Sequence, residues 1–240
     1  ALEPEIALPL LVSAAVLLCL LVVPLPDNRN APPGALWVLL AIMLATAAVT
    51  RRLRVRFGLD ARAALALPDP LYTLDLATVI LVGPRPAVLL AMAASLLVTL
   101  PDGPADHSAW VAVTRQAAAA GLSTLVAALA YRALSRLLAH PMSVVHAHLA
   151  AALVASLLLL LGASVLRTLE DGPQALPRVL SWRVALANPT LRFQALMLAI
   201  GPLLPLAEVL DDVEAELAWL LFLVPLYAIY SLALVSIRME

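Results

Sequence analysis

Residues 71–100 read LYTLDLATVILVGPRPAVLLAMAASLLVTL, and this stretch decides the fold. Two apolar segments flank the turn-forming run Gly83-Pro84-Arg85-Pro86, and one carboxylate, Asp75, lies within the first segment. In lipid, a freed backbone group is costly unless protein or a water-filled cavity satisfies it, so broken helices usually lie inside a bundle. We therefore expect the other helices to pack around this broken pair.

The composition indicates a polytopic membrane protein. Of 240 residues, 63% are apolar and 13% are charged, and the apolar residues fall in long runs rather than in amphipathic stripes. The net charge of −1 argues against nucleic acid as a partner. All fifteen basic residues are Arg, which excludes a Lys Schiff base and hence a retinal pigment. The single cysteine, Cys19, excludes an intrachain disulfide and a thiolate metal site, and no cofactor is expected.

We expect one all-α transmembrane domain over residues 1–240, broken at Gly83-Pro84. Its eight expected spans are 6–25, 35–50, 71–82, 86–100, 110–131, 149–166, 193–210 and 217–237. Eight crossings place ten arginines, including the dense run at 51–56, in the cytoplasm. Four arginines (Arg29, Arg85, Arg132 and Arg136) fall outside, with Arg115 in a span. This favours a bacterial inner-membrane protein with both termini in the cytoplasm.

The length of residues 71–82 leaves the topology open. Twelve helical residues span about 18 Å, against a hydrocarbon core of roughly 30 Å. Residues 71–100 therefore form either two short crossings, with the turn on the outer side, or a re-entrant or tilted hairpin. In either case Gly83, Pro84 and Pro86 are the expected hinge.

Polar residues within the spans are the candidate functional residues. Asp75 and Arg115 each lie near the start of a span, close to the cytoplasmic side, and we hypothesise that they pair. A pair of this kind either serves function or only fixes helix packing, and near-terminal charges also extend to the headgroups. Gln116 and Thr124 are eight residues apart and share a helix face with Gly121, which forms either a ligand groove or a packing surface of small residues. Gln194 is a further candidate ligand residue.

Histidines gather in the expected connection 132–148, which contains His140, His146 and His148. No Cys or carboxylate lies at ligand spacing from them, so we interpret this segment as a solvated loop and expect no metal site. The sequence also contains no nucleophile elbow, HExxH motif or phosphate loop. The chain is therefore not expected to be an enzyme, although an output domain beyond Glu240 could be catalytic.

The order of features from residue 35 onward resembles the multi-spanning N-terminal sensory region of bacterial signalling proteins with HD-GYP, GGDEF or histidine-kinase outputs. These features are the basic patch followed by LDLATVILVGPRPAVLLAMAASLL, RQAAAAGLSTLVAALAYRAL and LLFLVPLYAIYSLALVSIRME. The resemblance implies a sensor or anchor that passes a ligand or membrane state through its last helix to a cytoplasmic signalling domain or partner, usually as a homodimer.

Two alternatives remain open. The apolar run, Gly-Pro and Ala-rich run are also similar to those of substrate-binding membrane subunits of vitamin transporters, which implies a transport component that binds a small solute. The second alternative is that the chain is an accessory subunit that contacts other subunits of a larger membrane complex. The C-terminal residues Ser236 to Glu240 continue the helical pattern without a Gly, Asn or Pro stop. Such an end is expected where a cytoplasmic output domain follows, and equally where a last helix simply ends at the membrane interface.

Overall fold

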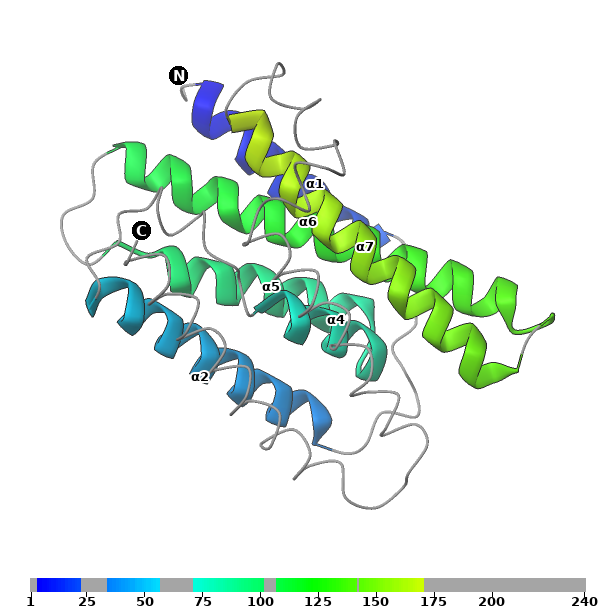
Figure 1. The fold of residues 1–240 in the computed structure, drawn as a ribbon. Coiled ribbons are helices and arrows are strands. Elements are labelled where there is room, and N and C mark those ends of the chain that lie inside the picture. Colours follow the sequence, from blue (N-terminus) through cyan, green and yellow to red (C-terminus); the bar gives the residue numbers. More distant parts are fainter. Residues whose placement is uncertain (1–3, 23–33, 57–70, 102–106, 142, 171–240) are drawn as a thin grey trace, which may run out of the picture.

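The computed structural model describes residues 4–22, 34–56, 71–101, 107–141 and 143–170. These ranges contain six α-helices and no strands: α1 Pro4–Val22, α2 Ala35–Arg56, α4 Leu71–Leu81, α5 Pro84–Thr99, α6 His107–Leu138 and α7 Val144–Glu170. Successive helices run in alternating directions (Figure 1). The all-α prediction is confirmed for this part of the chain.

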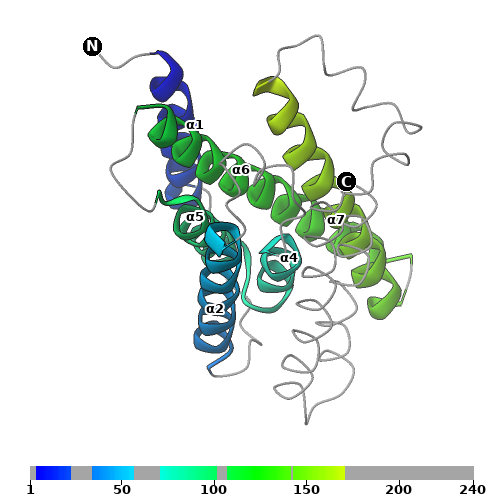
Figure 2. The same ribbon diagram turned by 60° about the vertical axis from the view of Figure 1, so that its left-hand side comes forward.

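Helix α4 is the centre of the described bundle. Every α4 residue whose side chain is described is buried, and the helix contacts α2, α5, α6 and α7. It lies between α2 and α5 on one side and α7 on the other (Figure 2). The described helices therefore pack around the broken pair, as residues 71–100 predict.

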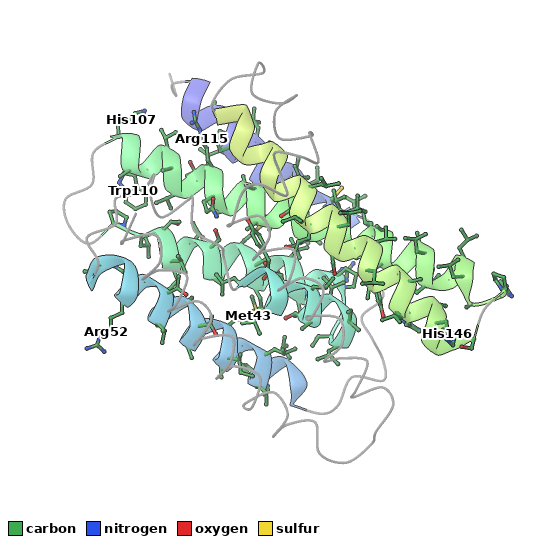
Figure 3. The ribbon with its side chains drawn as sticks, viewed as in Figure 1. Met43, Arg52, His107, Trp110, Arg115 and His146 are labelled. Carbon is green, nitrogen blue, oxygen red and sulfur yellow. The ribbon has the colours of Figure 1, made fainter. Side chains whose placement is uncertain are left out.

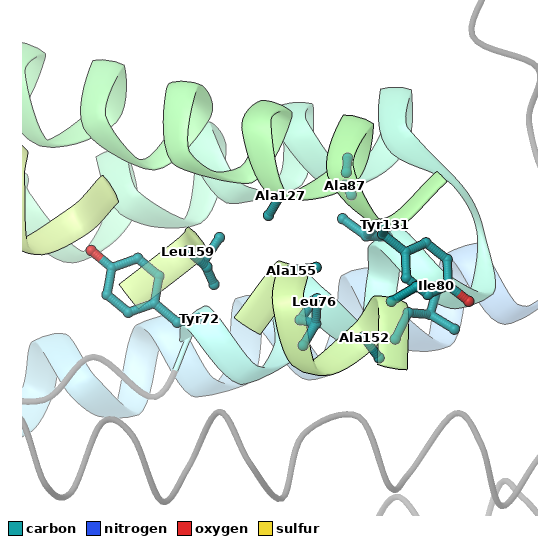
Figure 4. Packing of buried hydrophobic residues seen from close by; sticks show 12 residues of the cluster. Tyr72, Leu76, Ile80, Ala87, Ala127, Tyr131, Ala152, Ala155 and Leu159 are labelled. Atoms are coloured by element: carbon teal, nitrogen blue, oxygen red, sulfur yellow. The ribbon is translucent and has the colours of Figure 1, made fainter. Parts of the chain in front are cut away.

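Three clusters of buried apolar side chains hold the helices together. The first joins α4 to α6 and α7, where large residues such as Leu76 and Leu159 lie among alanines such as Ala127 and Ala155 (Figure 4). The second holds α2 against α4 and α5, and the third holds α1 against α5 and α6. Alanine is frequent in these clusters, and its small side chain lets helix backbones approach closely.

The described bundle buries several polar side chains and exposes many large apolar ones. The buried polar side chains are Thr50, Asp75, Thr78, Ser95, Gln116, Ser123, Thr124 and Ser156. Large apolar side chains are exposed on α1, α2, α5, α6 and α7, among them Leu21 at 79% and Trp37 at 71%. Soluble monomers rarely expose large contiguous apolar patches, so these faces require an apolar environment or partner.

Three helix boundaries differ from those expected. α2 continues through the basic run to Arg56 instead of ending at residue 50. α6 continues to Leu138 and α7 begins at Val144, so most of the expected connection 132–148 is helical. Residues 51–56 and 131–138 contain no Gly or Pro, and Arg, Leu and Ala favour helix, so polarity alone does not end these helices.

The expectation of about eight membrane spans is not supported. Among the described residues only Ala109–Leu138 is long and apolar enough to cross a membrane, and Pro9–Val22, Pro84–Thr99 and His146–Gly162 are shorter apolar segments. α4 has 11 residues, which cover about 16 Å, or roughly half of a hydrocarbon core. The expected spans 193–210 and 217–237 lie outside the described residues.

Candidate functional site

The turn between α4 and α5 contains backbone hydrogen bonds within itself. The carbonyl of Thr78 accepts hydrogen bonds from the N–H groups of Val82 at 2.9 Å and Gly83 at 3.1 Å. Gly83 has φ 116° and ψ 175°, a conformation that residues with a Cβ rarely adopt. The Thr78 hydroxyl donates to the carbonyl of Leu74 at 2.7 Å. Position 83 therefore requires glycine, and the predicted hinge coincides with a compact, buried turn.

The start of α5 carries few backbone donors. The first four N–H groups of a helix normally lack intrahelical partners. Here Pro84 and Pro86 have no N–H, and the N–H of Gly83 already donates to Thr78, which leaves only the N–H of Arg85. The prolines therefore reduce the desolvation cost of burying a helix break.

Asp75 is the most unusual side chain in the described core. It lies one turn into α4 and is 2% exposed. Tyr72 and Val79, which share its side of the helix, belong to the cluster between α4, α6 and α7. Burial of an ionised carboxylate is expensive without compensating partners, so intramembrane or core carboxylates are candidates for function.

The predicted pairing of Asp75 with Arg115 stays a prediction. α4 and α6 run in the same direction along the bundle (Figure 1). Asp75 precedes Gly83 by eight residues and Ala91 follows it by eight, so helical rise predicts that Asp75 lies near the level of Ala91 and Met92. Met92 in turn contacts Gly121 of α6. Arg115 is six residues from Gly121, about 9 Å along the axis, and is only half-buried. A pair would therefore require the arginine to extend nearly two turns toward the carboxylate.

The polar face of α6 is buried, as the site hypothesis requires. Gln116 is 7% exposed and Thr124 is fully buried. Ser123 donates to the carbonyl of Ala119 at 2.7 Å, whereas Thr124 Oγ1 and Ser95 Oγ on α5 have no hydrogen-bond partner within the described part of the chain. Buried hydroxyls are normally satisfied, so these two are the polar groups that a second conformation or a bound solute would satisfy.

Glycines on α6 and α7 mark close helix contacts. A Cβ built on Gly121 would lie 2.7 Å from Met92 Cγ and 3.6 Å from Val16 Cγ1, so α1, α5 and α6 meet there. A Cβ on Gly162 would lie 3.3 Å from Ser123 Cβ. Gly121 and Ser123 thus serve packing, while Gln116 and Thr124 remain the ligand candidates on this face.

One polar pair was missed by sequence reasoning. The hydroxyl of Tyr131 in α6 and Nδ1 of His148 in α7 are 2.7 Å apart, and their rings are 5.8 Å apart between centroids. Ser143 caps α7, with its Oγ 2.6 Å from Nδ1 of His146. The histidines at 146 and 148 are therefore helical residues with hydroxyl partners rather than parts of a solvated loop.

The remaining predictions concern a metal site, Gln194 and the resemblance to known families. No cluster of potential metal ligands occurs among the described residues. Gln194 lies outside those residues. No family model, curated protein or solved structure matches this chain. The resemblance to sensory regions and to transporter subunits is therefore an expectation from the sequence alone.

Proposed function

We propose that the chain is a multi-pass membrane module that passes a ligand or membrane state to a cytoplasmic signalling domain or partner. One observation carries the proposal: polar side chains, including Asp75 and Gln116, are buried while leucines, valines and tryptophans cover the outside. Exposure of this apolar surface to water would cost about 25 cal/mol per Å². A bilayer removes that cost, so membrane insertion accounts for the surface.

The structure supports a re-entrant hairpin for α4 and α5 rather than two full crossings. Gly83 is nine residues from Met92 along α5, so, starting from the Met92–Gly121 contact, the equal helical rise predicts that Gly83 lies near the level of Ala130 of α6. α6 continues eight residues farther to Leu138, which carries it about 12 Å beyond the turn. A hairpin that enters and leaves the membrane on the same side does not change the direction of the spans that follow it. The excess of arginines on the cytoplasmic side is therefore kept. The proposed topology is six crossings and one re-entrant hairpin, with both termini in the cytoplasm.

The hairpin is the proposed sensing element. It contacts α2, α6 and α7, and it contains the buried Asp75 and the buried Ser95 hydroxyl, which has no hydrogen-bond partner in the described part of the chain. Packed interfaces change between discrete arrangements rather than continuously, so a ligand that hydrogen-bonds to the Ser95 hydroxyl would favour one arrangement. The last helix, expected at 217–237, would carry that change to the cytoplasm.

Cross-linking between copies of the chain tests this coupling. In a Cys19→Ala background, Ser236→Cys reports the proximity of last helices in native membranes through the rate of disulfide formation. We expect Asp75→Asn and Thr124→Val each to change this rate several-fold, while Leu157→Ala, on an exposed face of α7, leaves it unchanged. Equal rates in all correctly inserted variants would contradict a coupling between the hairpin and the last helix.

The buried hydroxyls also favour a second candidate, a transport component that binds a small polar solute. Ser95, Gln116 and Thr124 would supply its hydrogen bonds. In this case Gln116→Leu should abolish solute uptake or binding, with no effect on cross-linking at position 236. Loss of both properties in the same variant would favour the sensor instead.

A further inference from the structure

One exposed stripe of α2 leads from a tryptophan through apolar residues to an arginine. The stripe consists of Trp37, Ala41, Leu44, Ala48, Arg52 and Val55, all of which are exposed. Their spacing of three or four residues places them on one helix face. Arg52 is fifteen residues from Trp37, about 22 Å along the axis. A single surface therefore offers an apolar track that ends beside a cation.

The charge at this end of α2 is concentrated and of one sign. Residues 51–56 hold four arginines and no acidic residue, and all six positions belong to the helix. Arg52 extends away from the neighbouring helices, at the end of the bundle where α6 begins with the exposed Trp110 (Figure 3). An exposed aromatic ring and clustered arginines are the side chains that anchor proteins at a membrane–water interface.

We propose that this stripe, residues 37–55 of α2, binds an anionic phospholipid, with the phosphate on Arg52 and an acyl chain along Leu44 and Ala48. Guanidinium groups bind phosphate oxygens in a bidentate geometry, and juxtamembrane clusters of basic residues attract anionic lipids. Free phosphate or nucleic acid would match the arginines but not the apolar track that continues from them on the same face. A phospholipid matches both. The inference rests on the proposed membrane location.

Photo-cross-linking in vesicles tests the proposal. Benzoylphenylalanine at Ala48, one turn from Arg52, is irradiated in vesicles of equal phosphatidylcholine and phosphatidylglycerol, and the captured lipid is identified by mass spectrometry. The same probe at Leu157 on α7 reports the bulk lipid ratio. We expect several-fold excess capture of phosphatidylglycerol at position 48, loss of the excess in Arg52→Gln, and its retention in Arg52→Lys.

The outcomes separate this inference from the membrane proposal. Capture of the two lipids at position 48 in their bulk ratio would overturn the lipid site alone. An excess of phosphatidylglycerol that Arg52→Gln does not reduce would do the same. Capture at Leu157 but not at position 48 would show that the stripe does not face lipid and would also overturn the site. Absence of lipid at both positions would overturn the membrane location itself. Because Arg52 is exposed, its variants should fold, and unchanged capture at Leu157 in each variant verifies insertion.

Discussion

Gly121 provides the sharpest test of how α5 and α6 pack. Its alanine substitution would place a Cβ 2.7 Å from Met92 Cγ and 2.8 Å from Met92 Sδ, so the methionine would have to move. Overpacking of this kind costs about 1–3 kcal/mol, and replacement of a helical glycine by alanine returns about 1 kcal/mol. The expected net effect of Gly121→Ala is a loss of about 1 kcal/mol in the free energy of unfolding.

A double-mutant cycle isolates the contact. Met92→Ala removes both atoms that meet the new Cβ, so in that background Gly121→Ala should stabilise by about 1 kcal/mol. The free energy of unfolding is measured by titrating SDS into dodecylmaltoside micelles for the four proteins. Gly162→Ala, whose Cβ would meet Ser123 Cβ at 3.3 Å, is the matched control with a milder clash. Stabilisation by Gly121→Ala in the wild-type background, with additive effects in the cycle, would refute the close packing.

Five further predictions each concern a single position. Gly83→Ala should lower the free energy of unfolding by about 1–3 kcal/mol in the same titration, because φ 116° is unfavourable for alanine; an unchanged value would contradict the turn geometry. Thr124→Val should raise it by about 1 kcal/mol, since a buried hydroxyl without a described partner is removed, whereas Thr78→Val should lower it because the bond to Leu74 is lost. Tyr131→Phe should cost about 1 kcal/mol, and a value near zero would exclude a stabilising bond to His148. The exposed Cys19 should resist a water-soluble maleimide in intact membranes and react after detergent is added, because thiolate formation requires water; rapid labelling without detergent would contradict a lipid-facing α1.

The sequence predicts the centre of the fold better than its edges. Gly83, followed by Pro84 and Pro86, interrupts an apolar run, and residues with these backbone restrictions favour a turn strongly. The packing of the surrounding helices follows, because two short apolar segments, the first of which contains Asp75, must be buried against other helices. The ends of α2 and α6 could not be predicted from polarity, because arginine propagates a helix as readily as leucine does.

The candidate site is predictable only where it depends on one helix. Gln116 and Thr124 are buried on one side of α6, as their spacing indicates. The position of Arg115 along the bundle axis relative to Asp75 depends instead on the Met92–Gly121 contact, which sets the axial position of α5 relative to α6. This contact joins residues far apart in the sequence, so no local sequence pattern predicts it. The contact between Tyr131 and His148 likewise requires the α6–α7 turn, and an alternation of histidines near a proline gives no indication of it.

The self-contained turn at Gly83 has a mechanical consequence. Its backbone hydrogen bonds join residues 78–87 to one another, so the cap of the α4–α5 hairpin does not depend on those bonds reaching a neighbouring helix. A shift of the hairpin along its axis would exchange side-chain contacts, many of them with alanines, and leave this cap intact. A displacement of α4 and α5 together would thus keep these backbone hydrogen bonds, and its free-energy cost would depend on the side-chain contacts that it exchanges.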